Sequence, residues 1–486
     1  MLPPDLVEAP SPLELWKRDR PLSFHWRTRD FERIHALGLY RNVDRKRNSA
    51  RDAILTEAIL AHDEGRWVSY SRHKAFYTGI QRYHGTDYTY ATVLSVVDEL
   101  LRLSLIEEQR AASGERGRQS RFRATPRLIE GFAGAVIGHD LREIIRLKDE
   151  GGTLIDYREN ASTIRMRREL EAINAFIAST DLRLVAPDAV RTTHHFRVAG
   201  AYYRPTLTPS LYRVFNRGSF GFGGRAYGWW QSLPKAYRRQ LLINGEPTSE
   251  PDFVQMHASI LYARRGKRLE HDVYETGEFS REDGKLAFNV ALNARSLPGT
   301  ITALTNKPEW PHNHQRTGAL IELLKRRNAA IKEDIHADQG VRLMRLDSDI
   351  ALETVRGCQK AGLPVLPVHD AMITPVRHEG RVAEIMEASA AKVLKAVSPC
   401  RVKVTGHRVP QMPSGVGVLR ALVLPGGSLP SQLDLLPASP RFSRPIRELR
   451  SRLGLTPPLA ATGWRGRGRP SAWSNRRFRE LLKEIA

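Results

Sequence analysis

The sequence predicts an α+β protein. Stretches with apolar residues at helical spacing alternate with short apolar runs typical of strands. The most distinctive run extends from Leu363 to Ile373, where two strand-like halves flank the polar pair His369-Asp370. This pattern indicates a hairpin that presents one carboxylate at its tip. With 486 residues and 41% hydrophobic content, the chain has room for two or three domains with apolar cores.

The composition favours a polyanionic partner. The formal net charge is +23 and the pI is about 10.3, and nucleic acid is favoured over an anionic membrane because no basic amphipathic anchor is evident. The two cysteines, Cys358 and Cys400, have no spacing typical of a zinc site or a disulfide framework. Neither a signal peptide nor an apolar run long enough to span a membrane is evident, so we expect a cytoplasmic protein with no membrane association.

Residues 1–50 form a polar extension to which the sequence assigns no role. Beyond it, the helix-spaced stretch from Thr89 to Leu103 is followed by an Arg-rich, Gly-containing hairpin. This order resembles a winged helix-turn-helix module over residues 51–135, in which a helix enters the major groove and a wing follows the phosphates. The expected backbone contacts come from the wing arginines Arg116, Arg118, Arg121 and Arg123. The expected base contacts come from the start of the helix, at Tyr88, Thr89, Tyr90 and Thr92.

A small helical domain with a solvated charged hairpin is the alternative interpretation of that module. Residues 136–195 follow as a helical connector, with helices expected over 141–148 and 163–179. From about residue 191 the chain interleaves aromatic residues with arginine, which suits either a nucleic-acid track or an ordinary core.

A second carboxylate is expected at a strand-to-helix corner. The segment from Leu241 to Tyr262 has the pattern of a strand, a turn, a short strand ending near Asp252, and a helix. Asp252 and Asp370 can meet only if their strands are neighbours in one sheet. A pair placed in this way could hold two divalent cations for an in-line displacement at phosphorus.

Between these carboxylates lies a helix with two cationic side chains. Arg281, Lys285 and Asn293 recur about one or two helical turns apart, and therefore lie along one face. Two cations followed by a polar side chain suit a triphosphate that lies against the helix, with its sugar near the last turn.

Over about residues 200–400 the chain resembles the superfamily of family A DNA polymerases and single-subunit, phage-type RNA polymerases. The segment beginning at Asp252 resembles motif A, the pair Arg281 and Lys285 resembles motif B, and His369-Asp370 resembles motif C. Upstream, Gly223-Gly224-Arg225-Ala226-Tyr227 is similar to the Gly-Arg element that touches the primer and template.

The resemblance implies a right hand over residues 196–409, with an antiparallel palm sheet and helical fingers. It implies that Asp252 and Asp370 bind two Mg²⁺ ions, for which Mn²⁺ is an alternative, and that Arg281 and Lys285 act in catalysis by gripping the triphosphate. Arg225 and Tyr227 would contact nucleic acid. The implied partners are a DNA template and primer with dNTP or rNTP, and the oligomeric state stays open.

Two departures from the family pattern affect the sugar pocket. His257 stands where family A DNA polymerases carry a glutamate, and Asn293-Ala294 stands where both families usually carry an aromatic residue followed by glycine. His257 and Asn293 are therefore expected to bind the nucleotide, and the choice between dNTP and rNTP stays open.

The expected function is template-directed polymerisation, most simply by a DNA polymerase or replication protein of a phage or mobile element that can also make primers. A single-subunit RNA polymerase or primase is one alternative. A non-catalytic DNA-binding regulator or replication initiator with a degenerate palm is another. Asp347 and Asp349 are expected to cap the helix that leads to the hairpin, or alternatively to support the metal site.

Residues 410–486 form a Pro/Gly/Ser-rich linker and a flexible basic tail. The tail contains Gly-Arg-Gly-Arg-Pro, which resembles an AT-hook whose arginines, Arg467 and Arg469, enter a narrow minor groove. A tail that merely increases solubility is the alternative.

Overall fold

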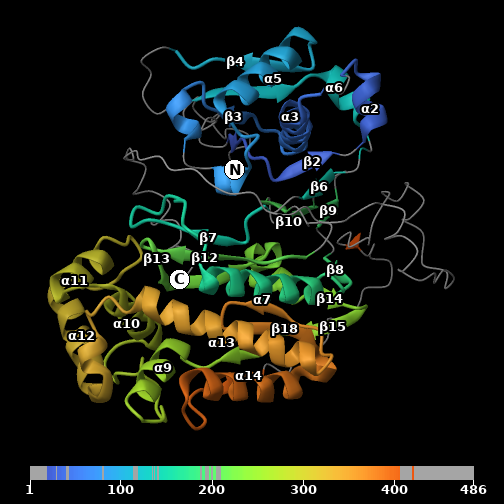
Figure 1. Ribbon diagram of the computed structural model, residues 1–486. Helices are drawn as coiled ribbons and strands as arrows, with labels where there is room; N and C mark the ends of the chain where they lie inside the picture. Colours follow the sequence, from blue (N-terminus) through green and yellow to red (C-terminus); the bar gives the residue numbers. More distant parts are fainter. Residues whose placement is uncertain are drawn as a thin grey trace, which may run out of the picture. The chain divides into compact units, whose positions relative to one another are not determined.

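The computed structural model describes residues 19–28, 30–39, 43–78, 81–112, 119–133, 135, 137–139, 142–186, 189–191, 196–198, 201–203, 209–404 and 419–420. Helices and strands are both abundant, which confirms the α+β class (Figure 1). The chain divides into two compact units. The first comprises the described parts of residues 1–143 and 186–208, and the second those of 144–185 and 209–421. The predicted domain boundaries stay predictions, and Arg116, Arg118, Arg467 and Arg469 lie outside the described residues.

The first unit contains a four-stranded sheet and a central helix. The sheet order is β1 (Arg20–Pro21), β3 (Val68–Tyr70), β5 (Ser120–Ala124) and β4 (Ile106–Gln109). The helices of this unit are α2 (Phe31–Ala36), α3 (Arg45–Asp63), α4 (Gln81–His84), α5 (Tyr90–Arg102) and α6 (Pro126–Gly131). Smaller sheets join β2 (Trp26–Thr28) to β6 (Ile137–His139), and β9 (Val190–Arg191), β10 (Phe196–Val198) and β11 (Ala201–Tyr203) to one another.

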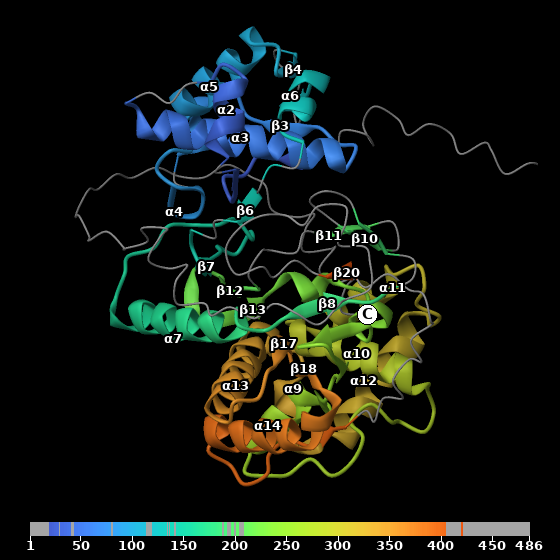
Figure 2. The ribbon, with the colours of Figure 1, turned by 90° about the vertical axis from the view of Figure 1, so that its right-hand side faces the viewer.

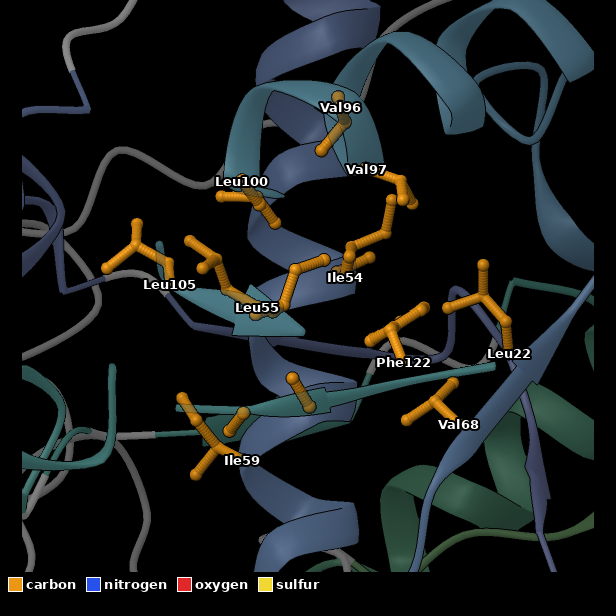
Figure 3. Close-up of a cluster of buried hydrophobic side chains, with 14 of the residues drawn as sticks. Leu22, Ile54, Leu55, Ile59, Val68, Val96, Val97, Leu100, Leu105 and Phe122 are labelled. Atoms are coloured by element: carbon orange, nitrogen blue, oxygen red, sulfur yellow. The ribbon is translucent and has the colours of Figure 1, made fainter. Parts of the chain in front are cut away.

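The apolar core of this unit surrounds α3. Figure 3 shows Ile54 and Leu55 of α3 facing Val97 and Leu100 of α5, with Phe122 of β5 beside them. Removal of these side chains from water is the main stabilising contribution to the unit. The antiparallel β4–β5 hairpin follows α5 in sequence, in the order that the sequence predicts.

The start of α5 differs in part from the expectation. Thr89 caps the helix, with its hydroxyl accepting a hydrogen bond from the Thr92 amide at 3.2 Å. Tyr88, which was expected to contact bases, instead belongs to the core. It is 2% exposed and its hydroxyl donates to the Leu22 carbonyl at 3.2 Å. A tyrosine buried in this way cannot reach a DNA groove, so this expectation is wrong.

The second unit is built on an eight-stranded sheet in which every strand pair is antiparallel. Its order is β19 (Val402–Lys403), β16 (Asp252–Phe253), β18 (Ala371–Pro375), β15 (Glu246–Ser249), β14 (Leu241–Ile243), β8 (Leu182–Leu184) and β20 (Leu419–Arg420), with β17 (Leu366–Val368) also paired to β18. A separate three-stranded sheet joins β7 (Ile145–Leu147), β12 (Tyr212–Asn216) and β13 (Ser219–Tyr227). The segment 141–148, expected to be helical, therefore contributes a strand instead.

The helices of the second unit fall into two groups. The helices α10 (Arg281–Asn293), α11 (Leu297–Thr305) and α12 (His314–Arg327) pack against one another. The helices α13 (Gly340–Lys360) and α14 (Glu379–Leu394) lie side by side, as Figures 1 and 2 both show, and α13 also packs against β13. The remaining helices are α7 (Ala161–Ile177), α8 (Lys235–Arg238) and α9 (Met256–Arg264). None of the helices in the described ranges has the length and apolar character that a membrane span requires.

Candidate active site

The tip of the β17–β18 hairpin is formed by His369 and Asp370. Val368 and Ala371 pair across the hairpin, so these two residues make the turn between them. His369 has φ of 57°, in the left-handed region that residues with a side chain rarely adopt. The fully buried Trp230 donates its indole N–H to the Pro367 carbonyl at 2.9 Å, which anchors the hairpin from β17.

Asp252 lies on the strand next to this hairpin. It pairs in register with Ala371, and the amide of Phe253 donates to the Asp370 carbonyl at 3.3 Å. The helix α9 begins just beyond, at Met256, after Gln255 has turned the chain with a φ of 50°. Asp252 therefore lies at a strand-to-helix corner, next to the hairpin turn that carries Asp370.

The two carboxylates interact unfavourably with each other. Burial raises the pKa of Asp252 to about 7, and the charges of Asp370 and Glu250 add to the effect. Burial also raises the pKa of Asp370, although Arg225 opposes the change. In addition, the Oδ1 atom of Asp252 is buried without a hydrogen-bond partner in the described structure. Like charges and an unsatisfied oxygen at one place are relieved by a bound cation.

The donor set suits a hard divalent cation. Mg²⁺ binds through one or two carboxylates and keeps water or substrate phosphate oxygens as its other ligands. Asp252 and Asp370 supply two carboxylates, and the unpartnered Oδ1 of Asp252 is a free donor. Among the residues that the structure describes, no cluster of three or more His, Cys, Asp or Glu side chains is arranged to hold a metal. The two carboxylates fit Mg²⁺ or Mn²⁺ that shares its other positions with a phosphate-bearing substrate, and the residues that the structure describes do not form a closed zinc site.

A β-bulge orients the side chain of Arg225. The pairing of β12 with β13 shifts register around Phe215, and Gly223 and Gly224 have φ of 70° and 82°. A Cβ on Gly224 would lie 2.7 Å from the ring of Phe215, so glycine is required there. A bulge redirects the side chain that follows it, and here it turns Arg225 towards α13.

Arg225 forms an ion pair with Asp347. Its Nη2 lies 2.6 Å from Oδ2 of Asp347 and its Nε 3.2 Å from the same oxygen. Nε2 of His257 lies 3.0 Å from that oxygen as well. Burial alone would raise the pKa of Asp347, but Arg225 and His257 outweigh it and hold this pKa below its ordinary value. Asp347 is therefore an ionised carboxylate with two cationic or polar partners.

The expectation that Asp347 and Asp349 cap a helix is wrong. The helix α13 begins at Gly340, about two turns earlier, so both residues lie within it. Asp347 is 1% exposed, and Asp349 binds Arg213 at 3.2 Å. The burial of Asp347 could have been inferred, because it follows the buried Leu343 by four residues and precedes the buried Ile350 by three.

The cationic residues lie on one helix, as the sequence predicts. Ser280 caps α10, which starts at Arg281. Arg281 binds Asp272 through Nε at 2.6 Å, whereas the exposed Lys285 forms no ion pair with any described residue. Burial raises the pKa of Asp252, and the positive charges of Lys235 and Lys285 oppose this rise, so Lys285 acts electrostatically on Asp252.

Asn293 and Tyr227 make contacts that the sequence did not indicate. The amide of Asn293 donates to the Asn289 carbonyl of its own helix at 2.8 Å, and no hydrogen bond joins it to His257 in the described structure. Tyr227 lies edge-on to the ring of His369, with the centroids 5.7 Å apart. Tyr227 is thus beside the β17–β18 hairpin, while the side chain of Asn293 is hydrogen-bonded within the last turn of α10.

The described wing arginines belong to the first unit and are already paired. Arg121 binds Asp19 at 3.2 Å and Arg123 binds Glu107. Both guanidinium groups also lie over the ring of Trp67, at 4.8 and 4.6 Å from its centroid. Arg123 binds Glu107 through Nε, so a phosphate can bind its Nη nitrogens without release of Glu107. Arg121 uses Nη1 for Asp19 and its other nitrogens for Gln109, so it would have to release one of these partners to bind a phosphate.

Comparisons with known proteins give little further information. No protein-family model matches the chain, and no curated protein sequence matches it. Among solved structures, the chain is similar to the POL domain of Pol1 from M. smegmatis in complex with DNA primer-template and dNTP, with 11% identity and a TM-score of 0.30. The match covers 54% of this chain and 52%, about half, of that one. A similarity this low carries no argument about the function, which we therefore infer from the site residues.

Proposed function

We propose that the chain is a template-directed nucleotidyltransferase that elongates a nucleic-acid primer. The observation that carries the proposal is the proximity of Asp252, on β16, to Asp370, in the turn of the adjacent β17–β18 hairpin. The two carboxylates have like charges, and a buried oxygen of Asp252 has no hydrogen-bond partner among the described residues. Such a pair has the chemistry of a divalent-cation site for phosphoryl transfer. The order of motifs along the sequence supports the same function.

Each site residue has a proposed task. Divalent cations bound there would activate the 3′-hydroxyl and neutralise charge as pyrophosphate leaves. Asp252 and Asp370 would hold the cations in place. Lys285, which is exposed and has no ion-pair partner in the part of the chain that the structure describes, binds the anionic oxygens of the triphosphate. Arg281 does so after releasing Asp272.

The remaining site residues are assigned to binding of the sugar and of the primer. His257 lines the pocket for the sugar, and Asn293 can join it only after leaving the Asn289 carbonyl. Tyr227 lies beside the hairpin with its ring stacked on Tyr212, and it is assigned a contact with the nucleic acid from that position. Arg225 is bound to Asp347, so any contact it makes with the primer or template is made from that fixed position.

DNA synthesis is the first candidate reaction, and synthesis of RNA or of primers is the alternative. His257 stands where family A DNA polymerases carry the glutamate that closes the pocket against a ribose 2′-hydroxyl, so that obstruction is absent here. The first unit, with helix α5 followed by the β4–β5 hairpin, is proposed as a winged helix-turn-helix module that binds DNA. The net charge of +23 supports a nucleic-acid partner. A replication protein of a phage or mobile element would combine these two parts.

Primer extension tests the proposal. Purified full-length protein with Mg²⁺ is given a primed DNA template and either dNTPs or rNTPs, beside the variants Asp252→Ala and Asp370→Ala. The wild type should add nucleotides and both variants should lose at least about 10³-fold in rate, since several kcal/mol of charge stabilisation is removed. Incorporation that survives both substitutions, or none by the wild type with either set of nucleotides, would overturn it. The second outcome, together with retained DNA binding, would favour the non-catalytic regulator.

A further inference from the structure

The strongest unassigned feature is the carboxylate of Asp347, which lies in the site without belonging to the carboxylate pair. It comes from α13 and receives one partner from β13 and one from α9. Arg225 approaches it through two nitrogens and His257 through Nε2 at 3.0 Å. Three elements distant in sequence therefore converge on one buried anion.

The segment around Asp347 is itself firmly held. Ser348 donates its hydroxyl hydrogen to the Gly224 carbonyl, which also accepts from Nε of Arg213 at 2.7 Å. Arg345 donates to the Phe220 carbonyl at 3.1 Å. These bonds fix one turn of α13 against the backbone of β13, so the Asp347 carboxylate is a rigid acceptor.

The negative charge of Asp347 determines which ring nitrogen of His257 carries the hydrogen. An ionised carboxylate can only accept hydrogen bonds, so Nε2 of the imidazole must carry the hydrogen. The neutral ring then has Nδ1 as its acceptor, and no described residue donates a hydrogen bond to it. Arg225, held at the same oxygen, exerts its positive charge on Asp370.

We propose that Asp347 is a positioning residue. It fixes the His257 ring so that Nδ1 accepts a hydrogen bond from a hydroxyl of the bound nucleotide. It also holds Arg225 beside Asp370. This inference rests on the proposed function. The groups that donate hydrogen bonds through oxygen in a nucleotide at neutral pH are its sugar hydroxyls. Asp347 acts on the substrate only through its two partners, because a 1% exposed carboxylate does not reach it directly.

Asp349 provides a matched control. It lies on the same helix two residues later, and its carboxylate binds Arg213 and Arg345. The Asp349→Asn variant therefore disturbs an ion-paired carboxylate of α13 without touching Arg225 or His257. If Asp347→Asn and Asp349→Asn lose stability equally, a defect seen only in Asp347→Asn is an effect on the site and not on folding.

The direct test is the tautomer of His257 in the full-length protein. Histidine is labelled with ¹⁵N, and the His257 signals are assigned by their loss in His257→Gln. The proposal predicts the hydrogen on Nε2 in the wild type and in Asp349→Asn, and a mixture of tautomers in Asp347→Asn. Hydrogen on Nδ1 in the wild type, or an unchanged pattern in Asp347→Asn, would overturn it.

Kinetics provide the second test. Asp347→Asn should lower kcat/KM by about 10–100-fold, as for other residues that orient a site group, while Asp349→Asn stays within about threefold of the wild type. In a His257→Gln background the further loss from Asp347→Asn should be smaller, because one of its two partners is already absent. Equal losses in both backgrounds would contradict the positioning role. If the wild type incorporates no nucleotide, the proposed function fails, and the tautomer still decides whether Asp347 positions His257.

Discussion

The backbone amide of Phe253 donates a hydrogen bond to the carbonyl oxygen of Asp370, at 3.3 Å. This bond joins β16, which contains Asp252, to the hairpin turn that contains Asp370. The two carboxylates are 118 residues apart in sequence (370 − 252), and this strand pairing brings them together. The like-charge pair that results makes the stability of the second unit depend on pH and on divalent cations.

The metal-free protein should lose stability as the pH rises from about 4 to about 7. The ordinary pKa of Asp252 is 3.8, and in the fold burial raises it to about 7. The unfolded chain therefore releases this proton at a lower pH than the folded chain does, which favours unfolding over that interval. We expect the free energy of unfolding to fall by about 1–3 kcal/mol across it. Urea unfolding at pH 4 and pH 7 with a chelator measures this change.

Asp252→Asn tests the origin of that pH dependence. The amide carries no charge, so the variant should be at least as stable as the wild type at pH 8 without metal, and its pH dependence should be weaker. Added Mg²⁺ should raise the Tm of the wild type more than that of the variant. An Asp252→Asn protein with the full pH dependence of the wild type would show that another group is responsible.

Gly284→Ala should destabilise the second unit and displace α10. A Cβ at Gly284 would lie 2.1 Å from the carbonyl oxygen of Tyr274, where backbone cannot give way easily. We expect a loss of about 2–3 kcal/mol. Gly380→Ala in α14 is the matched control, because nothing lies within 4 Å of its Cβ, and it should be neutral or stabilise by about 0.5–1 kcal/mol. Equal Tm values for the two variants would contradict the close packing of α10.

Lys285→Ala should weaken use of the triphosphate more than Arg281→Ala does. Lys285 has no ion-pair partner among the described residues and acts on Asp252, whereas Arg281 is already bound to Asp272. We expect kcat/KM for the nucleotide to fall about 10²-fold in the first variant and about 10-fold in the second. Lys325→Ala, which removes a lysine paired with Glu322 on α12, controls for loss of a surface charge. Steady-state incorporation kinetics give all three values, and a loss in Lys325→Ala equal to that in Lys285→Ala would remove the case for a specific contact.

Arg121→Gln and Arg123→Gln together should reduce the salt dependence of DNA binding. If both arginines bind phosphates, the slope of log K against log salt should decrease in magnitude by about 2. Fluorescence anisotropy with a labelled duplex at several salt concentrations measures the slope. A slope identical to that of the wild type would place these arginines outside the DNA interface.

The local parts of the site could be predicted from the sequence. The hairpin tip at Asp370, the strand-to-helix corner at Asp252 and the start of α10 at Arg281 each follow from alternation, turn residues and capping within about ten neighbouring residues. Short-range patterns of this kind determine helices and strands, so the α+β class was predicted correctly.

The parts that depend on tertiary contacts were missed. Asp347 has partners 122 and 90 residues away, and no local pattern shows that Arg225 and His257 would converge on it. Tyr88 has the polar tip of a base-contacting residue, but the surrounding core buries it. The strand β7 was taken for a helix because its pairing partner, β12, lies far along the chain. In each of these three cases a long-range contact determines the outcome.

Binding of Mn²⁺, measured by electron paramagnetic resonance in the presence of a nucleoside triphosphate, tests the central claim most directly. The paramagnetic ion reports its own bound fraction and stands in for Mg²⁺ without any requirement for turnover. The wild type and Asp349→Asn should bind Mn²⁺ with similar affinity, and Asp252→Asn and Asp370→Asn should each bind it at least about tenfold more weakly. Unchanged Mn²⁺ affinity in both Asp252→Asn and Asp370→Asn would contradict the claim that these two carboxylates hold the ion.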